Sequence, residues 1–225
     1  MKPQLHILAR QPLAGHCKTR LQTHCNADQA AIIAAALLEE TVAIAAHSWP
    51  GIIFLHGSPN QQHPLFVDLA KQYTLQLAAQ KGSDLGQIQT NALTISLNTG
   101  SPAAVIGSDL PGLKGAWLQE ACTRLKYNEN VLGLSPDGGY YLLGVQYIPG
   151  GLLQNICWSS SKVSSQLLHN ARHLHLQIST DLPQVNDVDT WQDLLAASAA
   201  SPTLSRRLYD RVPELWQEIT LCNRQ

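Results

Sequence analysis

Two fixed cations lie in a short loop that follows the first apolar run of the chain. Residues 10–21 contain Arg10, Gly15, Lys18 and Arg20, together with backbone N–H groups that no regular element would use. Ammonium, guanidinium and free amide groups hold phosphate oxygens at the end of a strand. The loop therefore indicates a phosphate site. Neither GxxxxGK[ST] nor GxGxxG is present, however, and a basic loop facing solvent fits the same residues.

Carboxylates that follow extended segments are a second chemical signal. Ser108 and Asp109 come after one apolar run, and Asp187 and Asp189 belong to a late Asn-Asp-Val-Asp-Thr segment. Magnesium takes one or two protein carboxylates and completes its octahedron with phosphate oxygens and water. These residues could therefore hold one ion together, although they are far apart in the sequence.

Two further segments combine an acidic residue with glycine. Asp137 precedes Gly138 and Gly139 between two expected strands, where the glycines permit a tight hairpin or the close approach of a ligand. Asp84 and Gly86 lie in a turn before an expected helix, which Asp84 can cap. Neither segment reveals its role locally.

Structural explanations compete with the chemical ones. Asp109 before Leu-Pro suits a turn, and Thr190 with Asp193 spells a capping box at a helix start. The His-Cys pairs at 16–17 and 24–25 match no usual zinc spacing. Nothing around the serines and cysteines resembles a hydrolase nucleophile elbow, so a catalytic triad is unsupported.

Read in order, six segments resemble bacterial glycosyltransferase-A-fold proteins of the nucleotide-diphospho-sugar-transferase-like family, some of them described as arsenosugar-biosynthesis glycosyltransferases. The segments are 9–21 (A-R-x-P-x-x-G-x-x-K-T-R-L), 83–86 (G-D-L-G, approximately), 107–113 (G-[ST]-D-x-P-x-L), 137–144 (D-G-G-Y-Y-L-x-G), 156–159 (I-x-W-S) and 187–190 (D-V-D-T). The resemblance covers about residues 5–195. Two departures, Trp191-Gln192 for Pro-Glu and Gly82-Ser83 for Glu-Gly, remove no proposed ligand.

The resemblance implies an α/β glycosyltransferase-A fold, with a Rossmann-like, mostly parallel sheet and helices on both faces. It also implies a divalent cofactor, Mg²⁺ or Mn²⁺. The expected metal ligands are Asp109, Asp187 and Asp189, and the expected catalytic residues are Asp109, Lys18 and Asp137. The expected nucleotide- or phosphate-binding residues are Arg10, Gly15, Lys18, Arg20, Asp84, Gly86 and Ser108.

Three functions are compatible with that resemblance. The first is sugar transfer from a nucleoside-diphosphate sugar to a small-molecule acceptor, with Asp137 as general base or acceptor contact. The second is nucleotidyl transfer from an NTP to a phosphorylated metabolite, because a single Asp109 instead of Asp-x-Asp resembles enzymes that make phospholactate-guanosine or molybdopterin-guanine conjugates. The third is a non-catalytic nucleotide-binding protein, since fold alone does not establish activity.

Apolar periodicity predicts the elements that position these residues. Strands are expected at 5–9, 51–56, 75–79, 103–107, 131–134, 140–145 and 174–178. Helices are expected at 28–46, 64–73, 84–97, 114–125, 162–170, 190–199 and 213–223. We expect one domain over 1–225, with a helical extension at 200–225.

Composition limits the partners. Fifteen Lys and Arg against sixteen Asp and Glu leave a net charge of −1, which provides no general field for nucleic acid or an anionic membrane. The longest uncharged stretch, 41–67, is interrupted by Pro, Gly and polar residues, so no membrane span is expected there. Five scattered cysteines without a CxxC pair are typical of reduced thiols, and we expect a cytoplasmic protein. The oligomeric state cannot be read from the sequence.

Overall fold

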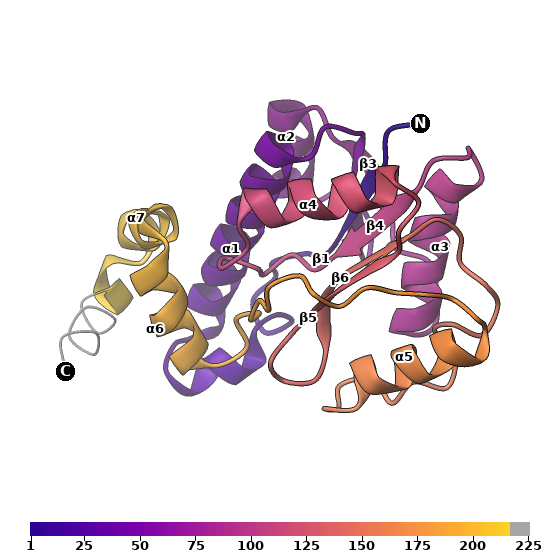
Figure 1. Cartoon of the computed structure of the whole chain (residues 1–225). Coiled ribbons are helices and arrows are strands. Elements are labelled where there is room, and N and C mark those ends of the chain that lie inside the picture. The colour runs from indigo at the N-terminus through magenta and orange to yellow at the C-terminus, as the bar shows by residue number, and fades with distance from the viewer. Residues whose placement is uncertain (217–225) are drawn as a thin grey trace.

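A six-stranded sheet forms the centre of the structure, a computed structural model that describes residues 1–216 (Figure 1). The strands are β1 (Gln4–Arg10), β2 (Ile53–Ser58), β3 (Gln76–Ala79), β4 (Ala103–Ile106), β5 (Val131–Leu134) and β6 (Tyr140–Val145). Their order is β3-β2-β1-β4-β6-β5, and only β6 runs antiparallel to its neighbours. The expected mostly parallel sheet is confirmed.

Helices cover both faces of this sheet, as expected. They are α1 (Ala27–Ser48), α2 (Pro64–Tyr73), α3 (Leu85–Leu97), α4 (Gly115–Lys126), α5 (Val163–His173), α6 (Trp191–Ala200) and α7 (Pro202–Arg211), with a short 3-10 helix η1 (Thr19–Thr23). Helices α1, α2 and α4 lie on one face, and α3 and α5 lie on the other (Figure 1). Helices α6 and α7 pack beside α1, away from α3 and α5.

Alternation along the strands sends apolar side chains into both layers. Ile7 of β1 packs with Leu118 of α4 in the cluster beneath α1, α2 and α4. Val105 of β4 packs with Leu167 of α5 in the cluster on the opposite face. Each face of the sheet is therefore buried, which is what a parallel sheet requires.

A third apolar cluster holds the C-terminal helices against the N-terminal half of α1. It includes Ile33 of α1, Leu21 of η1, Val188, Trp191 of α6 and Leu208 of α7. Because Leu21 follows the basic loop and Val188 lies between two of the carboxylates, this cluster fixes both segments relative to α1.

Helix α1 is the one helix of the described chain that is long and apolar enough to cross a membrane. Half of its most apolar window is buried within the protein. Its buried Glu39 accepts hydrogen bonds from Arg207 and Arg211 of α7, and Glu40 accepts one from Ser201. Its hydrophobic composition is therefore explained by the two apolar clusters that it joins.

The predicted strand at 174–178 is wrong. After α5 the chain forms no strand in this segment, and only Ser179 makes a single bridge, to Val131 of β5. His175 has φ +53°, which interrupts an extended conformation, while Leu176 and Ile178 pack into the cluster behind α5. The apolar side chains of 174–178 thus alternate because they pack into this cluster, although the segment itself is not a strand.

The C-terminal region also differs from expectation. Helix α7 was not predicted as a separate element, although Ser201 accepts the Leu204 N–H as its N-cap and Pro202 occupies its first position. The predicted helix at 213–223 lies mostly outside the described residues. Its first four residues, 213–216, are described and are helical.

Candidate functional site

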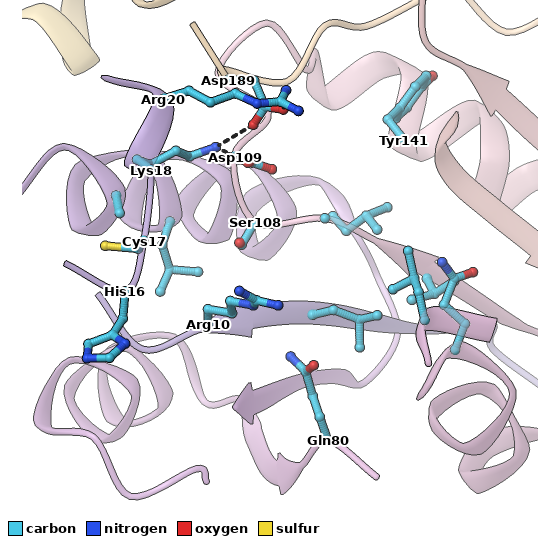
Figure 2. Close-up of a pocket in the computed structure, with 18 of the residues that line it drawn as sticks. Arg10, His16, Cys17, Lys18, Arg20, Gln80, Ser108, Asp109, Tyr141 and Asp189 are labelled. Carbon is cyan, nitrogen blue, oxygen red and sulfur yellow. Dashed lines mark hydrogen bonds and ion pairs between the residues drawn. The ribbon is translucent and has the colours of Figure 1, made fainter. Parts of the chain in front are cut away.

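A pocket of about 490 Å³ opens beyond the carboxyl ends of β1 and β4 (Figure 2). Its walls come from β1 and the loop after it, from β4 and the turn that follows, and from α1, α3 and β6. Open α/β sheets bind ligands at this edge. The volume is within the range of small-molecule sites, about 300–1,000 Å³.

Three carboxylates meet at one end of this pocket, where Asp109 and Asp189 line it and Asp187 lies beside them. Asp109, Asp187 and Asp189 each place an oxygen within 4.8 Å of the other two. The backbone brings them together, because the Val188 N–H donates to the Asp109 carbonyl at 3.3 Å. The next residue, Leu110, donates its N–H to Thr41 of α1 at 3.0 Å and so anchors the turn. The three residues expected to ligate a metal are thus neighbours.

Lys18 and Arg20 point into the same place (Figure 2). The Lys18 ammonium donates to Asp109 and to the Val188 carbonyl, and its Nζ lies 3.5 Å from Asp189 Oδ1. Arg20 Nη1 lies 3.0 Å from Asp189 Oδ2. Lys18 adopts φ +45° directly before η1, whose Leu21 is buried, and this local turn directs the ammonium inward.

The electrostatics of the cluster favour additional positive charge. Burial alone would lower the pKa of Lys18, but Asp109, Asp189 and Asp187 hold it above its usual value. Burial, with the charges of Asp109 and Asp189, raises the pKa of Asp187 to about 6. One buried ammonium therefore does not compensate three carboxylates. Clustered carboxylate oxygens are the ligand set that Mg²⁺ and Mn²⁺ prefer, so the residues fit such an ion.

Two further predicted residues line the pocket. Arg10 lies at the end of β1, and Ser108 precedes Asp109 (Figure 2). The Arg10 side chain is exposed and has no hydrogen bond or ion pair within residues 1–216, so its guanidinium is free to bind an anion. Gly15 does not line the pocket. It adopts φ +77° within the loop, where a left-handed conformation favours glycine.

Asp84 and Gly86 are not brought into this pocket. They line a neighbouring one of about 620 Å³ at the start of α3. Asp84 Oδ1 accepts the Gln87 N–H at 2.9 Å as the N-cap of α3, and a Cβ on Gly86 would lie 2.5 Å from the Leu153 carbonyl oxygen. Both residues thus have structural roles, and their contact with a nucleotide stays a prediction.

Asp137 also lies outside the pocket lining. It occupies an exposed turn between β5 and β6, where its Oδ1 accepts the Gly139 N–H at 2.9 Å. It is nevertheless close enough for its charge to help raise the pKa of Asp187. The turn predicted from Asp-Gly is confirmed, and a role for Asp137 toward an acceptor stays a prediction.

The capping box at the start of α6 is confirmed beside the carboxylate cluster. Thr190 accepts the Asp193 N–H at 3.3 Å, and Asp193 Oδ2 accepts the Thr190 N–H at 2.7 Å. Capping therefore explains Thr190 and Asp193, whereas the side chain of Asp189 reaches Lys18 and Arg20. Helix capping thus applies to Thr190 and Asp193, and the predicted role in the carboxylate cluster applies to Asp189.

Sequence reasoning missed several polar residues of the pocket. Gln80 donates to the carbonyls of Ala9 and His56, each at 2.9 Å, and Gln89 accepts the Tyr140 hydroxyl at 2.7 Å. Burial raises the pKa of Tyr140 well above its usual value. The position of Gln80 directly after β3 was a usable signal, because strand ends meet at the ligand edge. Gln89 lies within a helix and carried none.

Solved structures with the same architecture include one from Desulfovibrio desulfuricans G20, described as a candidate nucleotide-diphospho-sugar transferase. It is 23% identical, with TM-score 0.83, over 97% of this chain and 98% of that one. A 4-diphosphocytidyl-2C-methyl-D-erythritol synthase from Anaerococcus prevotii DSM 20548 is 10% identical, with TM-score 0.56, over 88% and 96%. A cytidylyltransferase from Leptospira borgpetersenii is 14% identical, with TM-score 0.51, over 96% and 97%. These similarities show the expected Rossmann-like α/β fold.

Sequence comparison places the chain in a family. No curated protein matches it. A family model described as "uncharacterized protein conserved in bacteria" matches residues 39–160, which contain β2 to β6 and Asp109. Since this match covers more than half of the chain, the protein belongs to the DUF2064 family.

Proposed function

We propose that this protein is a metal-dependent transferase that moves a sugar from a nucleoside-diphosphate sugar to a small-molecule acceptor. One observation carries the proposal: Lys18, Arg20, Asp109 and Asp189 line a pocket at the ligand-binding edge of the sheet, and Asp187 lies beside the two carboxylates. This combination suits a phosphate chain accompanied by a divalent ion. The overall similarity to the Desulfovibrio protein supports the same assignment.

The residues of the pocket have distinct tasks in this reaction. Departure of a nucleoside diphosphate leaves negative charge on phosphate oxygens, and Lys18, Arg20 and the free Arg10 can stabilise it. Asp109, Asp187 and Asp189 would hold Mg²⁺ or Mn²⁺, which supplies Lewis-acid stabilisation of the same oxygens when bound. Because charge on these oxygens grows as the bond to the sugar breaks, these groups stabilise the transition state more than the ground state.

Asp137 is the proposed contact or general base for the acceptor hydroxyl. The carboxylate of Asp137 lies in an exposed turn and is accessible, and its charge helps to raise the pKa of Asp187. Asp137→Asn is expected to lower turnover by about 10²-fold or more while donor affinity is retained. Unchanged turnover, measured with donor and acceptor at saturation, would remove the residue from this role.

Nucleotidyl transfer is the second candidate. The cytidylyltransferase from Leptospira borgpetersenii has the same fold over nearly the whole of both chains, and β4 delivers a single carboxylate, Asp109, to the pocket. In this reaction an NTP would condense with a phosphorylated metabolite and release pyrophosphate. No general base is needed, so the same Asp137→Asn variant would keep its turnover.

A thermal-shift panel of NTPs and nucleoside-diphosphate sugars, with and without Mg²⁺, tests both candidates. A ligand at about 100 times its Kd stabilises the folded state by about 2.7 kcal/mol, or about 5–10 °C at this size. Magnesium-dependent stabilisation by one nucleotide sugar would support sugar transfer, and preference for an NTP would support nucleotidyl transfer. No shift with any nucleotide would contradict both.

A further inference from the structure

The carboxylates that fit a divalent ion already hold a cation of the chain itself. Lys18 Nζ donates to Asp109 Oδ2 and to the Val188 carbonyl and lies 3.5 Å from Asp189 Oδ1 (Figure 2). Only 11% of the Lys18 side chain is exposed, so the ammonium is enclosed by the cluster. It occupies the position where positive charge is best stabilised.

Two of the carboxylates that would bind the ion, Asp109 and Asp189, are the ones that already contact the ammonium. Their oxygens lie within 4.8 Å of one another, and magnesium binds oxygen at about 2.0–2.1 Å. An ion bound by Asp109 and Asp189 would therefore lie against an ammonium that contacts both residues. Repulsion between a divalent and a monovalent cation at such a distance is strong in a partly buried site. One of the two must leave.

The charge balance favours the ammonium while no ligand is present. The three carboxylates carry three negative charges, and Lys18 and Arg20 together contribute two positive charges. The two cations thus leave the cluster with one net negative charge to attract a free divalent ion, against three if neither cation were present. If the ammonium moved to an anion in the pocket, the carboxylates would regain their attraction for the ion.

Nothing else in the described chain fixes the Lys18 ammonium. Within residues 1–216 its ammonium contacts only Asp109, the Val188 carbonyl and Asp189, and its side chain is a flexible four-carbon stem. Lys18 lines the pocket itself, so its side chain borders the space that an anion would occupy. The ammonium can therefore turn toward the pocket without a change in the core.

We propose that Lys18 excludes a free divalent ion from this site and admits it only together with a polyphosphate, whose oxygens draw the ammonium away from Asp109. This inference rests on the proposed function and names its substrate form: the metal–polyphosphate complex. Metal and polyphosphate then bind with positive coupling, and each raises the affinity of the other by the same factor.

Binding of Mn²⁺ to the whole chain without nucleotide, followed by electron paramagnetic resonance, tests the exclusion. Lys18→Gln is expected to bind Mn²⁺ at least about tenfold more tightly than the wild type, because it removes the competing charge. Arg20→Gln is the matched control: it removes a cation that also pairs with Asp189 but is 70% exposed. It is expected to change the affinity by less than about threefold.

A measurement on the wild type tests the coupling independently of the variants. Mg²⁺ alone is expected to leave Tm unchanged, whereas Mg²⁺ with inorganic pyrophosphate raises it. The proposal is overturned if the wild type binds Mn²⁺ as tightly as Lys18→Gln, or if pyrophosphate with Mg²⁺ gives no shift. Stabilisation by pyrophosphate but by no nucleotide would instead contradict the proposed function and leave the inference standing.

Discussion

Glu39→Gln is predicted to destabilise the protein although it keeps the size of the side chain. Glu39 is 10% exposed and accepts hydrogen bonds from Arg207 Nη1 at 2.6 Å and from Arg211 Nη1 and Nη2 at 2.9 and 2.8 Å. A buried charged pair that loses one partner costs about 3–5 kcal/mol. Because the arginine side chains are 27% and 38% exposed, solvent compensates part of this cost, and we expect about 2 kcal/mol.

Thermal unfolding followed by circular dichroism measures the effect. For a chain of this size, about 2 kcal/mol lowers Tm by about 4–8 °C. Glu120→Gln is the control, because Glu120 pairs with Arg124 one helical turn away but is 50% exposed. That pair is worth about 0.3–0.5 kcal/mol, so Tm falls by less than about 2 °C. Equal shifts in the two variants would refute the reasoning from burial.

Three further predictions concern the core and the pocket. Burial lowers the pKa of His6 to about 3, with a further contribution from His56, and lowers that of His56 to about 4. The unfolded chain therefore binds protons below about pH 6.5 that the folded chain excludes, and stability falls from there toward pH 4 by up to about 1.4 kcal/mol per pH unit for each histidine. Urea unfolding at pH 7 and pH 5 measures this loss, and His6→Gln should reduce it; an equal pH dependence in the variant would contradict the assignment. Gly133→Ala places a Cβ 2.4 Å from the Tyr141 ring, so we expect a loss of about 1–3 kcal/mol in urea unfolding, and an unchanged midpoint would show that the ring can move freely. Arg10→Gln should leave Tm unchanged and weaken nucleotide binding by about 3–10-fold in calorimetry, because its guanidinium has no partner within residues 1–216; unchanged affinity would exclude contact with the phosphates.

The local pattern of apolar residues predicted most of the helices and strands, because the side chains that make the pattern are the ones that pack in the core. Helix α2 has the predicted bounds, since Pro64 suits its first turn and Phe66 and Leu69 form its buried face. The prediction of a strand at 174–178 was wrong because apolar alternation does not by itself provide strand pairing. The alternating apolar residues of this segment pack in the cluster with α5, and pairing with the neighbouring β5 is limited to one bridge at Ser179.

The metal-ligand set was implied by the resemblance to a known family, and local sequence alone left it ambiguous. Asp109 and Asp187 meet because a backbone hydrogen bond joins Val188 to Asp109, a contact between segments nearly 80 residues apart. No pattern within either segment encodes that contact. The same limit applies to Asp84, whose motif is present but whose side chain caps α3 beside the pocket.

The position of the Lys18 ammonium also depends on three-dimensional structure. A basic loop predicts affinity for phosphate, but it does not predict that its lysine is held by two carboxylates that lie 91 and 171 residues away in the sequence. Likewise, the contact between Gln89 and Tyr140 depends on how α3 packs against β6. Long-range packing of this kind determines the fine structure of the pocket.

Calorimetric titration of Asp109→Asn tests the central claim most directly. The ligand is the nucleotide that stabilises the wild type most in the thermal-shift panel, titrated with and without Mg²⁺. Asp181→Asn is the control, because Asp181 is exposed and pairs with Arg124 away from the pocket. The wild type and Asp181→Asn should bind only with Mg²⁺, and Asp109→Asn should bind at least about tenfold more weakly. Equal affinity in all three proteins, or nucleotide binding that does not depend on Mg²⁺, would contradict a metal–nucleotide site at this cluster.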